Sequence, residues 1–497
     1  MKTRSIIYVL LASVMAGCQQ TFELKEHVQT TSQEPWTIVP TSDTAGGATS
    51  SLVIHTDSTL QTVDGFGSCF NEQGWASLSV LSEEQRDSIM TELFQPGAGA
   101  NFVMGRMPIG ANDFSLDYYS YDETDGDFEM KDFSIEHDKG TLIPFIKWAL
   151  AKNPDLKLWA SPWCPPKWMK KTKLYAECSD QIFNANVEKV KEAWKTAPDP
   201  LMARLEYQTN DTPLDKMGYE GITSFIMQDE YLKAYALYFG KFVDAYRNEG
   251  INIFMVMPQN EPNSAQVFPS CCWTSEDLNK FVGEYLGPEL EKHDVELYFG
   301  TIERPDPLKV DTLLKDPRSS KYIKGCGFQW AGKDALPVIH QNYPDMTLVG
   351  TEQECGNGLN NWEHAMHAWD LMRHYFKSGA NSYFYWNTSL FENRASRWGW
   401  HQNSLVTVND SAKTYKYTPE YYLMKHASHY VMPGARLLAL GGNYDDAIAF
   451  LNPDNSIIAL VGNQDDDAKT LTVSINGQEQ NVPVASHSVN TYVFKSK

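Results

Sequence analysis

The stretch Ile251-Asn-Ile-Phe-Met-Val-Met257 runs directly into Pro258-Gln-Asn-Glu-Pro262, which carries one acidic residue, Glu261. The run is too continuously apolar for an amphipathic helix and predicts a strand that is buried on both faces. A carboxylate at the end of such a strand is costly to desolvate unless it has partners. Glu261 is therefore either a structural residue that forms a cap or an ion pair, or a catalytic acid whose pKa is raised by burial.

A second carboxylate at the end of another strand favours the catalytic interpretation. Met346-Thr-Leu-Val-Gly-Thr351 predicts a short strand, and it is followed by Glu352-Gln353-Glu354-Cys355. Hydrolysis of a glycosidic bond uses two such carboxyl groups, because one donates a proton to the leaving oxygen while the other attacks or stabilises the sugar cation. The two motifs together indicate glycoside hydrolysis.

Strand and helix patterns alternate through the middle of the chain. A capping box at Ser82-Glu-Glu-Gln85 and apolar residues at helical spacing from Tyr231 to Glu249 are two of the helical patterns. Residues 63–415 are therefore predicted to be α/β, a (β/α)8 TIM barrel with its active site at the carboxyl ends of the strands. A doubly wound open sheet is the alternative, but no glycine-rich phosphate loop follows the first strand. The eight predicted strands are Val63–Phe70, Asn101–Met107, Leu156–Ser161, Ile251–Met257, Val295–Gly300, Gly325–Trp330, Thr347–Thr351 and Ala380–Asn387.

The segments on either side of the barrel have a different character. Residues 416–497 contain short strand-like runs separated by Asn, Asp and Gly turns, which predicts an attached all-β sandwich domain. Residues 51–62 are expected to join that sandwich, because they precede the barrel and need a sheet with which to pair. Residues 18–50 are rich in Thr, Ser, Gln and Gly and predict a flexible tether.

Residues 1–17 predict a targeting segment. Lys2 and Arg4 precede an apolar run from Ile6 to Ala16 that is too short to span a bilayer. The segment ends in Met15-Ala-Gly-Cys18, which resembles a bacterial lipoprotein signal in which the cysteine, here Cys18, is lipidated. An ordinary secretory signal with an incidental cysteine is the alternative. We expect an extracytoplasmic protein, in the periplasm or at the cell surface, that meets the membrane only through this lipid anchor.

Composition narrows the ligand classes. Lys plus Arg number 42 against 63 Asp plus Glu, a net charge of −21, which argues against nucleic acid and anionic membrane surfaces as ligands. A neutral substrate fits, and 14 Trp and 25 Tyr favour carbohydrate, since sugars stack on such rings. The cysteines after Cys18 contain no CxxC pair, so we expect no zinc site and several buried free thiols; the disulfide state of Cys271 and Cys272 stays open. Glycoside hydrolysis by two carboxyl groups requires no metal and no organic cofactor, so none is expected. A monomer is expected.

Six short motifs occur in one order, each at a predicted strand end. Their order is similar to that in glycoside hydrolase family 30, the family of lysosomal glucosylceramidase and of microbial β-1,6-glucanases, and the similarity runs from about Asp64 to the C-terminus. The resemblance implies a (β/α)8 barrel joined to a β-sandwich, and hydrolysis with retention of anomeric configuration. The motifs are Asp64-Gly-Phe-Gly67, Arg106-Met-Pro-Ile-Gly-Ala-Asn-Asp113, Ala160-Ser-Pro-Trp163, Gln259-Asn-Glu-Pro262, Thr351-Glu352 and Tyr385-Trp386-Asn387.

The resemblance implies roles for the acidic residues. Glu261 resembles the general acid/base and Glu352 the nucleophile, because Glu352 directly follows the strand-ending Thr351. Glu354 is a competitor for the nucleophile and, if it points to the same face, a candidate sugar contact. A retaining enzyme requires the two carboxyl groups to lie about 5–5.5 Å apart. We expect a raised pKa for Glu261 and a normal or lowered pKa for Glu352.

Four further residues match binding positions of the family. Asn260 matches the residue that holds the 2-hydroxyl, and Arg106 the residue that pairs with the nucleophile and keeps it ionised. Asp113 and Trp163 match positions that hydrogen-bond sugar hydroxyls. The alternatives are a strand-end cap for Asn260, a structural ion pair for Arg106 and a core aromatic for Trp163.

Two tryptophans complete the expected substrate-binding set. Trp386 matches a ring that lines the same subsite, although a core aromatic is its alternative. The sixth strand departs from the family pattern: where the family often ends in His-x-Tyr, this chain has Phe328-Gln-Trp330-Ala331, so Trp330 is the candidate there. The expected reaction is double displacement on a β-linked glucoside, with β-1,6-glucan preferred because a tethered extracytoplasmic enzyme meets polysaccharides. Glucosylceramide-like glycosides and β-xylosides stay open, and a non-catalytic glycan-binding lipoprotein is the rival from another class.

Overall fold

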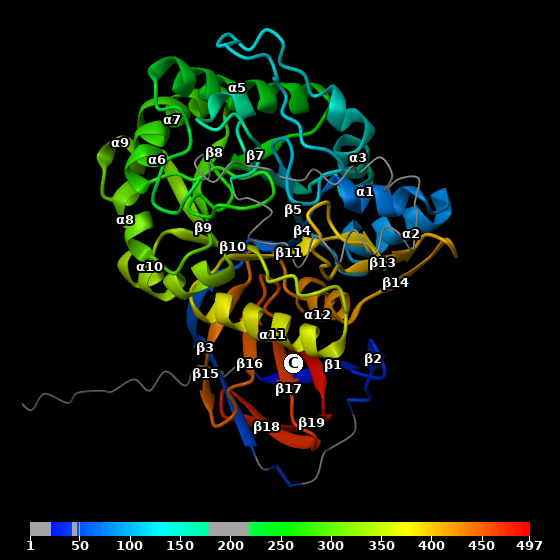
Figure 1. Cartoon of the computed structure of the whole chain (residues 1–497). Coiled ribbons are helices and arrows are strands. Elements are labelled where there is room, and N and C mark those ends of the chain that lie inside the picture. The colour runs from blue at the N-terminus through cyan, green and yellow to red at the C-terminus, as the bar shows by residue number, and fades with distance from the viewer. Residues whose placement is uncertain (1–20, 42–46, 49, 178–217) are drawn as a thin grey trace, which may run out of the picture.

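The computed structural model describes residues 21–41, 47–48, 50–177 and 218–497. Eight parallel strands close into a barrel that occupies the upper part of the molecule in Figure 1, and β11 pairs with β4 to complete the ring. The predicted (β/α)8 barrel and all eight of its predicted strands are confirmed. The barrel strands, in order around the ring, are β4 (Gly65–Cys69), β5 (Met104–Pro108), β6 (Lys157–Ser161), β7 (Ile253–Val256), β8 (Glu296–Ile302), β9 (Ile323–Gln329), β10 (Thr347–Glu352) and β11 (Ser382–Asn387).

Burial on both faces explains why these strands have almost continuous apolar sequences. All six residues of β11 and all five of β4 and β5 are buried, because helices cover the outside and side chains fill the inside. Inside the barrel, the rings of Trp159 and Phe384 meet edge to face with centroids 5.4 Å apart. The barrel interior is thus a packed core, and a ligand has to bind above it, at one end of the strands.

Helices surround the barrel, as Figure 1 shows. The capping box predicted at Ser82 is present: its hydroxyl accepts from the Gln85 amide (3.2 Å), and the Gln85 side chain accepts from the Ser82 amide (3.0 Å). Among the described residues, no helix has the length and apolarity that a bilayer crossing requires. The helices are α1 (Glu72–Ser79), α2 (Glu83–Phe94), α3 (Leu142–Lys152), α5 (Asp229–Asn248), α6 (Ser275–Phe281), α7 (Gly287–Leu290), α8 (Pro307–Leu314), α9 (Pro317–Ser320), α10 (Leu336–Asn342), α11 (Trp362–Lys377) and α12 (Pro419–Ser428).

The C-terminal residues form the predicted β-rich domain below the barrel (Figure 1). Its nine strands follow the order β19-β18-β3-β15-β16-β17-β20-β1-β2, and apolar side chains from strands in different parts of that order meet in one core. Strand β19 has a mostly polar sequence, Gln478-Glu-Gln-Asn-Val-Pro-Val484, that by itself does not predict a strand. The strands are β1 (Phe22–Thr31), β2 (Thr37–Ile38), β3 (Ser50–Thr62), β15 (Arg436–Gly442), β16 (Ala447–Leu451), β17 (Ile457–Asn463), β18 (Lys469–Ile475), β19 (Gln478–Val484) and β20 (Ser488–Ser496).

The prediction of a flexible tether is wrong for residues 22–31, which form β1. This strand pairs antiparallel with β20 from Phe22 opposite Ser496 to Thr31 opposite Ser488. Leu24 and Val28 are buried by this pairing. Polar composition suggested a tether, but a strand is also stabilised by backbone hydrogen bonds to its neighbours, here β20 and β2, and composition does not report those neighbours.

The barrel and the β-rich domain meet across α11 and α12, which lie between them in Figure 1. Helix α12 packs against α11, β20 and β1, and the sandwich strands resume at Arg436, so the boundary falls after α12 and not at the expected residues 415–416. A small sheet of β12 (Ser389–Phe391), β13 (Val406–Asn409) and β14 (Thr414–Tyr417) follows the last barrel strand. Within the described residues, the free, buried cysteines are Cys69, Cys164, Cys271, Cys272, Cys326 and Cys355.

Candidate active site

A cavity of about 260 Å³ lies at the carboxyl ends of the barrel strands. Its walls come from the last residue of β10 and from the segments that follow β5, β6, β7, β8, β9 and β11, so residues far apart in the sequence share one space. Six of the predicted site residues lie in this wall. The lining residues are Asp113, Trp163, Asn260, Glu261, Gln266, Phe268, Glu303, Arg304, Trp330, Ala331, Glu352, Trp400 and Gln402.

Glu261 follows β7 with its backbone in the left-handed region, at φ 47°. A non-glycine residue holds this conformation only where its surroundings fix it, and such strain is concentrated at functional sites. Here the Glu261 amide donates to the carbonyl of Thr301 at the end of the neighbouring strand β8 (3.1 Å). The side chain is 8% exposed, and burial raises the pKa of its carboxyl group, as expected, although a hydrogen bond from Gln329 opposes the shift.

Glu352 is the last residue of β10 and has the stronger donors. Arg106 Nη1 lies 2.9 Å from its Oε2, and Trp330 Nε1 lies 3.1 Å from its Oε1. The expectation of a normal or lowered pKa is wrong: burial raises the pKa of Glu352 to about 7, with the charge of Glu261 adding to the rise and Arg106 opposing it. Removal from water outweighs the ion pair in this enclosed position.

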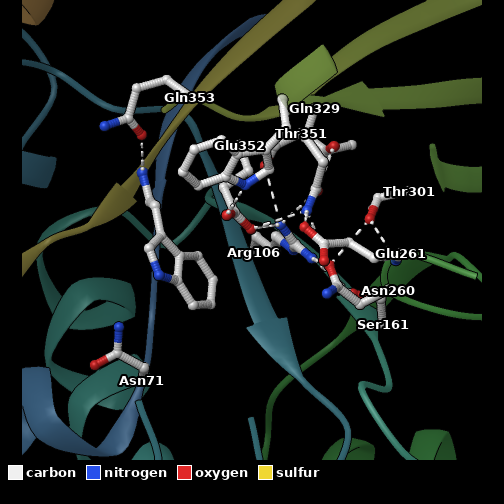
Figure 2. Close-up of polar contacts among 12 residues, drawn as sticks. Asn71, Arg106, Ser161, Asn260, Glu261, Thr301, Gln329, Thr351, Glu352 and Gln353 are labelled. Carbon is white, nitrogen blue, oxygen red and sulfur yellow. Dashed lines mark hydrogen bonds and ion pairs between the residues drawn. The ribbon is translucent and has the colours of Figure 1, made fainter. Parts of the chain in front are cut away.

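One amide joins the two carboxyl groups. Gln329 Nε2 lies 3.0 Å from Glu261 Oε1 and 3.3 Å from Glu352 Oε2, and Figure 2 shows both side chains converging on it. The distance between Glu261 Oε1 and Glu352 Oε2 therefore cannot exceed the sum of these two N–O distances. That limit is shorter than the separation of about 6.5 Å or more at which inverting glycosidases hold a water between their carboxyl groups.

Three hydrogen bonds to its side-chain carbonyl oxygen fix the orientation of Asn260. Arg106 Nη2 (2.6 Å), Thr301 Oγ1 (3.0 Å) and Gln329 Nε2 (3.2 Å) all donate to Asn260 Oδ1. The nitrogen of the Asn260 amide bonds to none of the described residues, and the residue lines the cavity. This arrangement leaves an NH2 donor for a ligand oxygen.

Arg106, on β5, is fully buried beneath the cavity, where its guanidinium donates to both Glu352 and Asn260 (Figure 2). Its guanidinium carbon lies 5.0, 4.6 and 5.3 Å from the ring centroids of Trp159, Trp163 and Trp386. Cation–π contact on several sides compensates for the loss of hydration. The position matches the expected partner of Glu352, and the same group also orients Asn260.

Asp113 and Trp163 lie in the cavity wall as predicted, but Trp386 does not. Asp113 Oδ1 is buried without a hydrogen-bond partner among the described residues, which leaves an acceptor for a ligand. Trp386 is fully buried, lies against Trp163 with ring centroids 5.2 Å apart, and is absent from the cavity wall. The strand-end position of Trp386 was predicted correctly, but its ring packs among the aromatic side chains beneath the site.

Glu354 lies outside the site, which corrects both expectations for it. Its carboxylate binds Lys333 and His367, each at 2.8 Å, and these contacts lower its pKa to about 2, with the His367 hydrogen bond contributing most. The expectation assumed that residues two apart point to the same face. Strand β10 ends at Glu352, however, so the alternation no longer holds two residues later.

Sequence reasoning missed several polar residues of the site, namely Gln266, Glu303, Arg304, Gln329 and Gln402. Gln329 was noted only as part of a departure from the family pattern, yet it bonds to both carboxyl groups. Glu303 was missed because the fifth barrel strand was expected to end at Gly300, whereas β8 continues to Ile302 and makes Glu303 a strand-end carboxylate. A correct strand boundary would have found it.

Two family models cover most of the chain. Residues 63–197 and 209–431 match the model of the glycosyl hydrolase family 30 TIM-barrel domain, and residues 442–492 match that of the glycosyl hydrolase family 30 beta sandwich domain. The chain belongs to glycosyl hydrolase family 30. The resemblance inferred from six motifs is thus confirmed, and a β-glycosidase hydrolase activity follows from membership.

The relatives of this chain include proteins named glucosylceramidases and endo-1,6-glucanases. Putative glucosylceramidase 1 of Caenorhabditis elegans is 28% identical over 86% of this chain and 78% of its own length. The endo-1,6-beta-D-glucanase neg1 of Aspergillus fumigatus is 26% identical over 88% of this chain and 86% of its own. Among solved structures, the endo-beta1,6-glucanase BT3312 is 26% identical and superposes with a TM-score of 0.76, over 94% of this chain and 99% of its own.

Proposed function

We propose that this family 30 protein is a retaining glycosidase that cleaves β-1,6-linked glucan by double displacement. The observation that carries the proposal is the contact of one amide, Gln329, with both Glu261 and Glu352. It keeps one oxygen of each carboxyl group within the sum of two hydrogen-bond lengths of the other, which favours the short separation of a retaining enzyme over the wider separation of an inverting one. The choice of β-1,6-glucan is supported by the endo-1,6-glucanases among both the sequence relatives and the structural neighbours.

The assignment of nucleophile and acid follows from the charges around each carboxyl group. Both are buried, so at neutral pH the pair favours a single negative charge. That charge belongs on Glu352, since Arg106 and Trp330 donate to it, whereas the donors to the Glu261 side chain, Gln329 and Gln266, are neutral amides. Ionised Glu352 attacks the anomeric carbon while Glu261 protonates the leaving oxygen. Glu261, now ionised, then takes a proton from water, which releases the sugar from Glu352 with its configuration retained.

The decisive experiment is hydrolysis of a panel of β-glucans, followed by proton NMR of the first product formed. We expect reducing sugar from β-1,6-glucan and a β-anomer that appears before mutarotation. An α-anomer as the first product would overturn retention, and turnover of another linkage alone would overturn the assignment to β-1,6-glucan. A wild-type protein that binds glucan without cleaving any substrate would be a glycan-binding lipoprotein instead.

Glucosylceramide is the second candidate substrate, because the C. elegans and mouse relatives are named glucosylceramidases. The same panel, extended with detergent-dispersed glucosylceramide and a β-xylan, separates the candidates. If kcat/KM for glucosylceramide exceeds that for β-1,6-glucan, the second candidate replaces the first.

We further propose that the protein is a lipid-anchored monomer in an extracytoplasmic compartment. The N-terminal sequence supports the anchor, and Cys18 lies outside the described residues. Both catalytic groups come from one chain, so no second copy is needed to complete the site. Replacement of Cys18 by Ala is expected to move the protein from the membrane fraction to the soluble fraction, and equal partitioning of the variant and wild type would contradict the anchor.

A further inference from the structure

Glu303 is a buried carboxyl group in the cavity wall that double displacement does not use. It directly follows β8, and only 1% of its surface is exposed. Its Oε1 has no hydrogen-bond partner among the described residues. Buried polar atoms in folded proteins are nearly always paired, so an unpaired one that faces a cavity points to a missing ligand group.

The strand ends hold Glu303 next to the acid/base. Strands β7 and β8 are neighbours in the barrel, and the Glu261 amide donates to the Thr301 carbonyl, while the Thr301 amide donates to the Gln259 carbonyl (2.8 Å). Glu303 follows Thr301 by two residues. Burial raises the pKa of Glu303 to about 8, and the negative charge of Glu261 contributes to this rise.

The position of Glu303 around the ring indicates which part of the substrate it meets. Asp113 and Trp163 follow β5 and β6, on one side of Glu261, and Glu303 follows β8, on the other side. A general acid must face the leaving oxygen, so the group beyond that oxygen lies on the acid's side of the cavity. With the β5 and β6 side taken by the sugar that is attacked, the leaving group extends over β8.

The chemistry of this wall suits a hydroxyl group. A carboxyl group held neutral by burial has one O–H donor and a free carbonyl acceptor, and a sugar hydroxyl is likewise both donor and acceptor. Arg304, the next lining residue, is occupied on the outer side by Glu220, whose Oε1 lies 3.0 Å from Arg304 Nε. An alkyl chain in this position would leave the buried carboxyl group unpaired, at a cost in binding.

We propose that Glu303 hydrogen-bonds a hydroxyl of the leaving-group sugar and so selects carbohydrate over lipid leaving groups. The inference rests on the proposed glycosidase function and extends it by a specificity residue on the leaving-group side. Glu303 contacts substrate in this role but takes part in no bond-breaking step.

The test compares two substrates that share the same sugar on the nucleophile's side. One is a β-1,6-linked glucose oligosaccharide, and the other is the matching 4-nitrophenyl glycoside, whose leaving group has no sugar hydroxyl. For Glu303→Leu we expect kcat/KM on the oligosaccharide to fall about 10-fold or more, because a buried hydroxyl loses its partner. On the aryl glycoside the change is expected to stay within about 3-fold of wild type, which also demonstrates that the variant is folded and that Glu261 and Glu352 still work.

Glu303→Gln is the matched control, since its amide keeps a donor and an acceptor in the same place. We expect it to remain within about 3-fold of wild type on both substrates. Equal losses on both substrates for Glu303→Leu would overturn the inference, as would a Glu303→Gln variant as defective on the oligosaccharide as Glu303→Leu. So would a wild-type protein that cleaves the aryl glycoside but no sugar-linked substrate. A wild type that cleaves neither would instead refute the proposed function itself.

Discussion

Glu261 and Glu352 have the same side chain, the same burial and opposite roles, and the difference comes from their hydrogen-bond donors. Glu352 receives a guanidinium and an indole N–H, both of which stabilise an anion. Glu261 receives a neutral amide and has a backbone conformation fixed by the end of β8. Two donors on one carboxyl group thus decide which acid attacks and which gives up its proton.

Substitution of each acid tests this division. Glu352→Gln is expected to abolish turnover on every glycoside, because the amide cannot form the glycosyl intermediate. Glu261→Ala is expected to lose far less on an aryl glycoside with a good leaving group than on glucan, since such a group departs without protonation. Steady-state kinetics on both substrates measures the difference, and equal losses by Glu261→Ala on the two would contradict its role as the acid.

The pH profile tests Arg106. Its cation lowers the pKa of Glu352, so the loss of that charge in Arg106→Gln raises this pKa further above its value of about 7. Because Glu352 must be ionised to attack, the acid limb of kcat/KM is expected to move to higher pH by about one unit or more, with lower activity at pH 6–7. Arg106→Lys is the control, since it keeps a cation. If the acid limb of the Arg106→Gln variant does not move, Arg106 does not control the ionisation of Glu352.

At the scale of elements, the ends of the barrel strands position most side chains of the site. Four consecutive barrel strands, β7 to β10, are followed or ended by Glu261, Glu303, Gln329 and Glu352. Parallel strands bring these ends to one rim, whatever the distance between them in the sequence. A strand that is one or two residues longer or shorter than expected therefore moves a side chain into or out of the site, as Glu303 and Glu354 show.

Strand β1 gives the element-scale prediction. Leu24 is 6% exposed in the core of the β-rich domain, so Leu24→Ala is expected to lower the free energy of unfolding by about 2 kcal/mol or more. The neighbouring Lys25 is exposed, and its ion pair with Glu23 is largely solvated, so Lys25→Ala is expected to change stability by less than about 0.5 kcal/mol. Urea denaturation measures both. If Leu24→Ala were as neutral as Lys25→Ala, residues 22–31 would not contribute a strand in solution.

At the scale of the whole molecule, the barrel supplies the site and the β-rich domain supports it through α11 and α12. Strand β3 belongs to the lower sheet and ends at Thr62, three residues before β4 begins the barrel. The two parts are therefore joined by a very short connection as well as by packed helices. Net charge is the other property of the whole chain, and at −21 it gives the protein a net negative field.

Salt dependence tests whether the substrate is neutral, as proposed. Steering of a ligand by the protein field depends on ionic strength only when the ligand is charged. The kcat/KM for β-1,6-glucan is therefore expected to vary less than about 2-fold between about 0.05 and 0.5 M NaCl, a range over which the Debye length shortens about 3-fold. A uronate-containing glycan serves as the comparison, because screening should speed its association with a negative protein. A large rise with salt for the proposed substrate would count against a neutral glycan.

The sequence alone predicted what depends on local pattern. Eight apolar runs of strand length between helical patterns sufficed for the barrel, and strand-end carboxyl groups sufficed for Glu261 and Glu352. Asp113, Trp163, Asn260 and Trp330 also lie where the motifs indicated. These successes share one physical basis: in a parallel barrel, the rim position of a residue follows from its place at the end of a strand.

Only the tertiary structure decided what depends on distant neighbours. The pairing of β1 with β20 turns a polar segment into a strand, and packing against other rings buries Trp386 outside the cavity wall. Lys333 and His367 hold Glu354 outside, while burial raises the pKa of Glu352 in spite of Arg106. Each outcome reflects long-range contacts and desolvation, which arise only when the chain has folded, and no local sequence pattern contains them.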